Sequence, residues 1–586
     1  MSSTLPPPPP SGPPSGPPTG PPTGPPEYLE SGGGAPVPPQ PRRSGSSAKK
    51  GLFLGGGVVG LVAVGVGAWA AYNFFSTGPQ PSEALPARTL GYASIDLDPS
   101  GGQKIEALRT LNKFPAFEDE VGIDTDDDIR KAIFDRIQDE ADCEGLDYGD
   151  DIEPWLGDRA AFAAVDVGGE DPDPVIVLQV KDADQADAGL DKIKACDDSD
   201  DLGWAINGDW SVLAESSDIA EKVVEATEKG SLADDDDFRK WTGEAGDPGV
   251  VTLYAGPEAG DYFADHADSM FGFPLGMVDD YACSMELPSD AGSGDGSDDV
   301  GSDDFGSDDV GPDCGDPSGP DISADLEKKL RDFGGLAVTV RFDDGAIELE
   351  TAGDAGIGIP GLSASGATAD VVQSLPADTG AVYGLGFADG WFGDLVDYVA
   401  PYTGSDADEL MAELSDMTGL DLPGDAETLA GDSAALALGS DFDPDAFFGS
   451  EDGSDVPIAL KIKGDPDKID TVLDKLRGMA GPATNVLESD SEGDVIAIGP
   501  NADYRADVLK DGSLGDNDVF KDVVREADQA QTVLFVNVDE FEDVIAEAAG
   551  DSDQELVDNL KPVSGFGVSA WVDGDVTHAV VRLATN

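Results

Sequence analysis

The sequence predicts an α+β fold made of two tandem duplicated units, which follow one N-terminal transmembrane helix and a disordered Pro-rich tail. Three observations predict this organisation. An uncharged apolar run lies near the N-terminus, a set of segments recurs in the same order in two parts of the chain, and strand patterns alternate with helical ones. We expect largely antiparallel sheets with helices on one face of each.

Residues 1–50 are predicted to be a disordered, Pro/Gly-rich cytoplasmic tail. Repeats of (Ser/Thr)-Gly-Pro-Pro dominate its first part, and they favour an extended polyproline conformation that buries nothing. Pro25-Pro26-Glu27-Tyr28 has the Pro-Pro-x-Tyr form that WW-type grooves bind, but matches this short are common in Pro-rich tails. We therefore expect a spacer.

Residues 51–75 are predicted to be a single transmembrane helix. The run carries no charge, and about 20 apolar residues suffice to cross the roughly 30 Å hydrocarbon layer of a bilayer. Four basic residues precede it closely, namely Arg42, Arg43, Lys49 and Lys50. Because basic flanks stay in the cytoplasm, we expect a cell-membrane protein with a cytoplasmic N-terminus and an extracellular C-terminal ectodomain.

The alternative for the same run is a cleaved signal peptide, since Ala68-Trp69-Ala70 resembles a small-x-small cleavage site. The length of the run and the long segment before it favour a retained anchor. Within the run, the spacing of Gly56 and Gly60 permits two membrane helices to approach closely, so homodimerisation through these glycines is a further expectation.

The chain is strongly acidic, with a formal net charge of −86. Such a surface repels nucleic acid and anionic lipid headgroups, which excludes nucleic-acid binding, and it attracts cations weakly. The acidic residues are spread along the chain rather than confined to ligand loops. This spread favours adaptation of the surface to a salty exterior, and a calcium-loaded protein is the alternative.

The part after the anchor is long enough for several domains, and it repeats. A linker at 76–84 leads to unit 1 at 85–353, and a second linker at 354–373 leads to unit 2 at 374–586. The matching segments occur in the same order in both units: LPARTLGY (85–92) with LPADTGAVY (375–383), WLGDRAAFAA (155–164) with LAGDSAALAL (429–438), 173–193 with 456–476 without a gap, and GSLADDDDF (230–238) with GSLGDNDVF (512–520). Unit 1 also carries an acidic insert at 289–316 with no counterpart in unit 2.

Within unit 2 the elements follow the β-α-β-β-α-β order of ferredoxin-like folds. A helix at 540–560 and a closing hairpin at 563–585 should extend the sheet, and unit 1 shows the same order from Val175 to Tyr254. The periodicity of apolar residues assigns the elements of unit 2 as follows: a strand at 456–463, a helix at 465–480, two short strands that end at 494–500, a helix at 502–509 and a strand at 532–538.

All four cysteines follow the predicted anchor, in an oxidising compartment that favours disulfides. Four cysteines allow three pairings, and we favour Cys143 with Cys196 and Cys283 with Cys314, since both pairs are local in sequence. Metal binding is the alternative, but no spacing resembles Cys-x-x-Cys.

Two fragments resemble nucleotide-binding motifs. Ser100-Gly101-Gly102-Gln103 matches the signature of ABC ATPases, and Asp539-Glu540 ends a strand like a Walker B motif. No Gly-x-x-x-x-Gly-Lys-(Ser/Thr) loop accompanies them, and they lie in different units. We interpret both as coincidental and predict no cofactor.

A third fragment resembles a calcium loop. Asp124, Asp126 and Asp128 alternate as such a loop requires, and Asp135 takes its twelfth place. Ile129 occupies the position that needs glycine, and Asp135 is shorter than the usual bidentate glutamate. We therefore predict the acidic first turn of a helix here and no metal site.

The two histidines are the remaining candidates for catalysis. His266 lies in a predicted helix and His578 on the closing strand. Neither lies near a nucleophile elbow or a His-x-x-x-His pair, so we predict structural roles for both and no catalytic residues.

One segment resembles a known family. The run GYASIDLDPSGGQKIEALRTLNKFPAFEDEVGID (91–124) resembles the start of the domain of unknown function 3352 family, through Asp96, Asp98-Pro99-Ser100, Gln103-Lys104 and Phe114-Pro115. The resemblance implies a membrane-anchored protein of a kind found mainly in actinobacteria, with a Pro/Gly-rich cytoplasmic tail. It implies no activity and no catalytic residues. In physical terms, Asp98-Pro99-Ser100 is typical of a strand-to-helix turn, with Ser100 as a candidate helix cap.

These observations predict a non-enzymatic binding or structural component of the cell envelope, anchored in the bilayer through 51–75. Its partner is an unidentified envelope protein, an apolar ligand or cations. An envelope-acting hydrolase and a calcium-dependent surface protein are the alternatives. An apolar groove or tunnel would favour ligand carriage, and solid domains would favour protein binding.

Overall fold

A computed structural model describes the part of the chain on which the following rests. The described residues are 79–96, 102–117, 130–131, 134–135, 138, 145–169, 171–197, 202–266, 324–355, 366–403, 406–450, 453–480, 485–549 and 554–586. The predicted tail, the predicted anchor at 51–75 and the acidic insert at 289–316 lie outside these ranges. Inside them, no helix is both long and apolar enough to cross a membrane.

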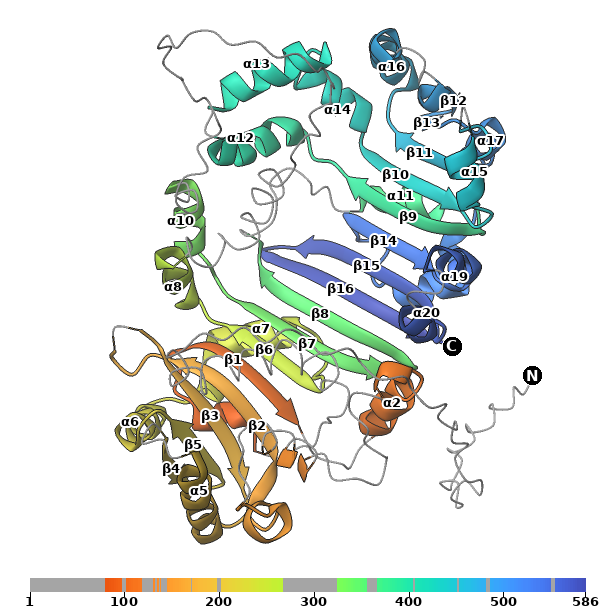
Figure 1. Cartoon of the computed structure of the whole chain (residues 1–586). Helices are drawn as coiled ribbons and strands as arrows, with labels where there is room; N and C mark the ends of the chain where they lie inside the picture. The colour runs from red at the N-terminus through yellow and green to blue at the C-terminus, as the bar shows by residue number, and fades with distance from the viewer. Residues whose placement is uncertain are drawn as a thin grey trace, which may run out of the picture. The chain divides into compact units, whose positions relative to one another are not determined.

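The described chain forms one continuous antiparallel sheet, in the order β12-β13-β11-β10-β9-β14-β15-β16-β8-β7-β6-β1-β2-β3-β5-β4 (Figure 1). The first eight strands in chain order are β1 (Thr89–Asp96), β2 (Leu156–Val165), β3 (Asp173–Val180), β4 (Gly203–Asn207), β5 (Trp210–Ala214), β6 (Val251–Ala255), β7 (Leu336–Asp343) and β8 (Ala346–Asp354). The second eight are β9 (Thr379–Gly386), β10 (Ser433–Gly439), β11 (Ile458–Lys463), β12 (Ser489–Glu492), β13 (Val495–Ile498), β14 (Thr532–Asn537), β15 (Val563–Asp573) and β16 (Val576–Thr585).

The two halves of this sheet have the same strand order. From the outer edge inward, β4-β5-β3-β2-β1-β6-β7-β8 corresponds one to one with β12-β13-β11-β10-β9-β14-β15-β16. The halves join where β8 pairs with β16, and the pairing is symmetric about Glu350 and Val580. Each half therefore presents its last strand to the other, as expected of two copies related by a twofold axis, and this supports the duplication inferred from the sequence.

The ferredoxin-like pairing predicted within each unit is wrong in one respect. The strands β11, β13 and β12 pair as in that fold, but β14 pairs with β9 and β15 rather than with β11. The strands β10 and β9 lie between them. The β-α-β-β-α-β order along the chain is real, yet it does not determine which strands become neighbours.

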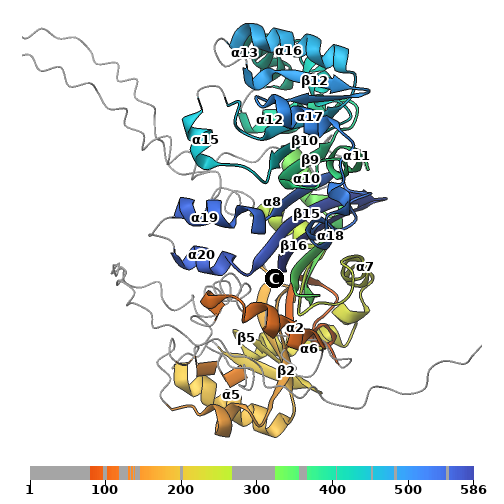
Figure 2. The same cartoon turned by 90° about the vertical axis from the view of Figure 1, so that its right-hand side faces the viewer.

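Helices cover both faces of the sheet, whereas the sequence predicted one face (Figure 2). On the α7/α18 face, apolar clusters pack under α6 (Ser217–Thr227), α7 (Asp236–Glu244), α11 (Ala367–Gln373), α17 (Ala502–Leu509) and α18 (Asp518–Val523). On the opposite face, called here the α2/α16 face, clusters pack under α2 (Gly102–Leu111), α5 (Ala183–Asp197), α14 (Gly424–Ala430) and α16 (Pro466–Ala480).

The remaining helices lie before β1 or between consecutive strands. They are η2 (Pro81–Ala84), η3 (Tyr148–Ile152), η4 (Leu232–Asp234), α8 (Ala259–Asp265), α10 (Ala324–Arg331), α12 (Trp391–Thr403), α13 (Ala407–Thr418), α15 (Pro444–Gly449), η7 (Leu514–Asp516), η8 (Asp539–Phe541), α19 (Glu542–Ala549) and α20 (Gln554–Leu560). The helix predicted at 540–560 is thus broken into shorter helices, while the closing hairpin at 563–585 is confirmed as β15 and β16.

The ungapped match of 173–193 with 456–476 holds for the helices but not for the strands. The structure pairs Val177 with Ala161 in one half and Lys461 with the equivalent Ala435 in the other. Val177 and Lys461 are therefore counterparts, one position off the ungapped match. Because side chains alternate between the faces of a strand, a shift of one residue exchanges the buried sets, and Lys461 takes the place of a core valine.

Candidate functional site

The two histidines lie in structural surroundings. His578 is buried on β16 and stacks on Trp571, with ring centroids 5.1 Å apart, and its Nε2 is 4.0 Å from a carboxylate oxygen of Glu244. His266 ends α8, where it stacks on Tyr262 and lies 3.8 Å from Asp171.

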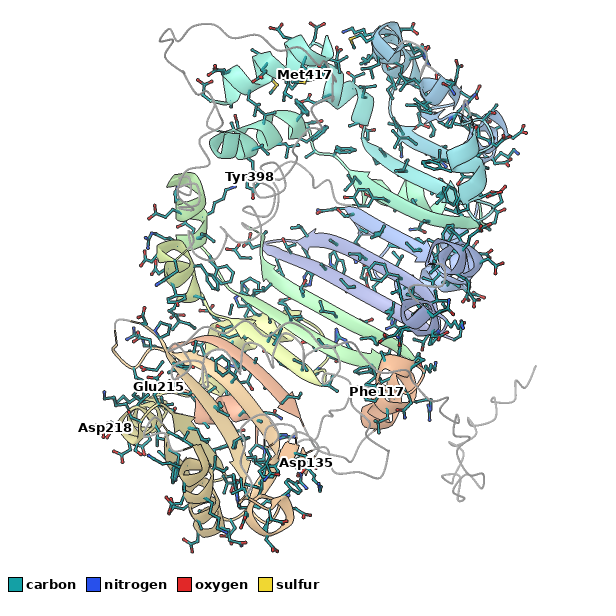
Figure 3. The ribbon with its side chains drawn as sticks, viewed as in Figure 1. Phe117, Asp135, Glu215, Asp218, Tyr398 and Met417 are labelled. Carbon is teal, nitrogen blue, oxygen red and sulfur yellow. The ribbon has the colours of Figure 1, made fainter. Side chains whose placement is uncertain are left out.

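The calcium-like fragment is only partly described. Asp124, Asp126 and Asp128 lie outside the described residues, whereas Asp135 lies in a helical segment and pairs with Lys131 one turn earlier (Figure 3). The described residues contain no cluster of three metal-ligating side chains. The helical interpretation of Asp135 agrees with this local pairing.

Other predicted positions are described in part or not at all. Cys143, Cys283 and Cys314 lie outside the described residues and Cys196 lies in α5, so the disulfides stay a prediction. The strand-to-helix order around Asp98-Pro99-Ser100 is confirmed by β1 and α2, while the turn itself lies outside the described ranges. Asp539-Glu540 begins η8 after β14.

An apolar groove lies on the α2/α16 face of the second half. It has a volume of about 450 Å³, within the range of roughly 300–1,000 Å³ that small-molecule sites occupy. Its floor is formed by β9, β10 and β11, and its walls by α12, α13 and α14. The lining side chains are Tyr383, Leu385, Phe387, Trp391, Phe392, Leu414, Thr418, Leu420, Leu422, Ala426, Leu429, Ala430, Ala434, Leu436 and Leu460.

Strand geometry places the floor residues side by side. Tyr383 pairs with Leu436, and Leu436 pairs with Leu460, so the three side chains form a row across three strands on one face. Tyr383 and Leu436 remain 46% and 45% exposed. Exposed apolar side chains that lie together on a concave surface make this groove a candidate binding site.

The walls are held by local capping. The side chain of Asp406 caps the start of α13 by accepting a bond from the Glu409 N–H at 2.8 Å. Gly419 ends α13 in the left-handed conformation, with φ 63°, which glycine adopts without steric cost. The chain then turns back through Leu420 and Leu422 to α14, so that both helices face the same hollow.

The groove has almost no polar character. No lining residue is charged. Thr418 donates its hydroxyl to the Leu414 carbonyl at 2.6 Å, and the buried Trp391 Nε1 has no hydrogen-bond partner within the described part of the chain. Trp391 also lies against Phe387, with ring centroids 4.8 Å apart. The lack of charged lining residues suits an uncharged apolar group, because an unpaired charge would be costly to bury here.

The wall of the groove is acidic on its outer side. The segment 387–432 carries twelve Asp and Glu residues and no Lys, Arg or His. Basic side chains of two other helices approach it. Lys475 on α16 pairs with Asp421 and Asp425 at 3.1 and 2.6 Å, and the amine of Lys329 on α10 lies 4.6 Å from the centre of the Tyr398 ring on α12. Figure 3 shows the wall between the labelled Tyr398 on α12 and Met417 on α13.

The equivalent row of the first half consists of different side chains. Ala93, Phe162 and Ile176 pair in the positions of Tyr383, Leu436 and Leu460. Ile176 packs into a cluster with the fully buried Trp155. The helix that follows β1, α2, lies on β7 and buries Leu108 and Leu111 there. Its counterpart α12 packs with α13 instead.

Sequence reasoning missed this groove because its residues come from six separate elements. The available signal was α12 itself, an unusually apolar helix whose sequence is WFGDLVDYVAPYT. Among the described side chains of α12, the only buried apolar ones are Val396 and Ala400. The other described apolar side chains of this helix are therefore at least partly exposed.

Comparison with known proteins finds a matching family for part of the chain. Residues 54–205 match the model of the family described as "Protein of unknown function (DUF3352)", a range that includes the run on which the resemblance was based. The matched range covers β1, α2, β2 and β3 and ends before the groove. No curated protein and no solved structure is significantly similar to the chain.

Proposed function

We propose that this chain, which belongs to the DUF3352 family over residues 54–205, is a non-enzymatic binding protein that holds the apolar chain of a lipid-like molecule. The observation that carries the proposal is the groove of about 450 Å³, which is lined by apolar side chains of β9–β11 and α12–α14. Ligand sites are typically concave and mostly apolar with few polar groups, and this groove has that composition.

The proposal includes the location that the sequence predicts. Residues 51–75 would anchor the protein in the cell membrane, with the described residues on the extracytoplasmic side. The start of the described chain is tied to the first half, where Arg159 of β2 donates a hydrogen bond to the Pro79 carbonyl. The groove floor on β10 is nine strand spacings from β2, or roughly 40 Å along the sheet at about 4.8 Å per strand.

This separation supports a carrier or receptor that works away from its own anchor. A groove so distant from the anchored end need not open toward the anchoring bilayer. It could take its ligand from an adjacent layer of the envelope or from a partner.

The test is photolabelling of the full chain in zwitterionic nanodiscs with a neutral amphiphile. The probe has a twelve-carbon tail that carries a diazirine and a maltoside head, and labelled peptides are identified by mass spectrometry. We expect labels in 383–436. Leu436→Glu should reduce this labelling at least ten-fold, because it places a charge on the groove floor.

The matched control is Leu556→Glu on α20, where the leucine is 54% exposed and lies outside the groove. It should leave the labelling unchanged, and melting temperatures of both variants report on folding. Labelling that is absent from 383–436, or equal in the two variants, would overturn the proposal.

A further inference from the structure

We infer that the groove selects amphiphiles by head-group charge, and that its ligand carries a cationic head on the apolar tail. This inference rests on the proposed function and specifies its ligand class. It combines two independent features of the site, an apolar interior without charged lining residues and an acidic outer wall.

The head group of a bound amphiphile must lie outside the apolar interior of the groove. The groove is open to solvent along the exposed Tyr383 and Leu436, and its interior contains no charged side chain to pair with a head group. A charged head is therefore expected to stay at the mouth in water while the tail lies on the floor.

Carboxylates of α12 and α13 determine the electrostatic field at the mouth of the groove. Asp394 and Asp397 lie on α12, whose first residues Trp391 and Phe392 line the groove, and Glu413 adjoins the lining residue Leu414. All three carboxylate residues are exposed, as is Asp416 on α13. Within the described part of the chain none of these four forms an ion pair, and they outnumber the lysine that lies against α12, Lys329 over the Tyr398 ring. The net field that they exert at the mouth is therefore negative.

The expected strength of the preference for a cationic head group follows from Coulomb's law. At a separation of about 10 Å in water, each unscreened acid changes the affinity for a unit charge by a factor of about two. Four acids at that separation then favour a cationic head, and disfavour an anionic one, by roughly ten-fold each at low salt. The preference should shrink as the Debye length falls below the separation.

The experiment extends the photolabelling of the full chain in zwitterionic nanodiscs to three probes with the same twelve-carbon diazirine tail. Their heads are trimethylammonium, maltoside and carboxylate, and labelling of 383–436 is compared at equal free probe concentration. We expect the order cationic, neutral, anionic at 20 mM NaCl, with at least ten-fold between the first and last. At 500 mM NaCl the three should converge.

The decisive variant combines Asp394→Asn, Asp397→Asn, Glu413→Gln and Asp416→Asn. It should keep the labelling by the neutral probe and reduce the difference between cationic and anionic probes to less than three-fold. The control variant neutralises four exposed acids of the first half, Asp184, Asp191, Glu221 and Glu225, and it should keep the full difference.

The outcomes separate the two proposals. Equal labelling by all three heads at low salt, or an unchanged order in the groove variant, overturns charge selection and leaves the groove as a binding site. Absence of labelling with every probe overturns both. If Leu436→Glu instead converts a dimer of the chain into a monomer in sedimentation experiments while no probe binds, the groove is an interface between copies.

Discussion

Glu348 lies at the join between the two halves and is held by arginines from both. Its carboxylate accepts hydrogen bonds from Arg341 at 2.8 Å, from Arg582 at 2.8 Å and from Arg525 at 3.0 Å. Burial alone would raise the pKa of this carboxyl, but the hydrogen bond from Arg525 and the charges of the three arginines outweigh it and lower the pKa. Glu348 therefore stays ionised and compensates a buried cationic cluster.

Glu348→Gln should destabilise the protein by up to about 3–5 kcal/mol, because it removes the buried carboxylate that three arginines share. The carboxylates that remain beside these arginines, Glu350, Asp343 and Asp522, are more exposed to solvent than Glu348. The free energy of unfolding from urea denaturation measures this. Glu327→Gln, which removes an exposed partner of Arg331, should cost less than about 1 kcal/mol. Similar effects of the two substitutions would contradict the role assigned to Glu348.

Because Lys461 is buried, we expect the free energy of unfolding to depend on pH in an unusual way. Burial on β11 lowers the pKa of this amine to about 8, and the amine donates to the carbonyl and hydroxyl oxygens of Ser374. Between pH 8 and about 10.5 the unfolded chain binds more protons than the folded one, so stability should rise with pH in that window. The contribution is on the order of 3 kcal/mol.

Lys461→Met removes the buried charge at similar volume. It should raise the stability at pH 7 by roughly 1–3 kcal/mol and remove the rise between pH 8 and 10. Unfolding curves of both proteins across this range provide the comparison. A rise that persists in the variant would show that another group titrates there.

At the scale of single elements, two glycines with similar open surroundings should respond in opposite ways to alanine. Gly493 forms the tight turn between β12 and β13 with φ 65°, whereas Gly478 lies in α16 without positive φ, and an added Cβ would meet nothing within 4 Å at either. Gly493→Ala should cost about 1 kcal/mol and Gly478→Ala should stabilise by about 0.5–1 kcal/mol. Thermal melting distinguishes the two signs.

Many of the individual helices and strands were predictable from the sequence. The strand at 532–538 and the hairpin at 563–585 are found close to their predicted bounds, since alternation of apolar residues is a local signal. The insertion of β9 and β10 between β11 and β14 was not predictable, because strand neighbours depend on long-range packing. The groove was missed for the same reason. Its row of Tyr383, Leu436 and Leu460 exists only once three strands are paired.

At the scale of the whole molecule, the two halves share one sheet and should unfold together. The strands β8 and β16 pair along nearly their full lengths, and the Glu348 cluster spans the same join. Amides of β8 and β16 should therefore exchange with solvent as slowly as those of β2 and β10, whereas the edge strand β12 should exchange faster. Faster exchange at the join than in the interior of either half would show that the halves open separately.

The asymmetry between two similar halves is the basis of the functional account. In the first half α2 packs on β7, whereas in the second half its counterpart α12 packs with α13 beside the groove. Duplicated units can keep one copy for packing while the other acquires a site.

The most direct test of that account is a crystal structure of the full chain with a brominated-tail trimethylammonium amphiphile, using the anomalous signal of bromine. The account predicts bromine between the β9–β10 floor and the walls formed by α12–α14, in contact with Leu436. Bromine sites confined to other surfaces, or none at a concentration that saturates photolabelling, would contradict it.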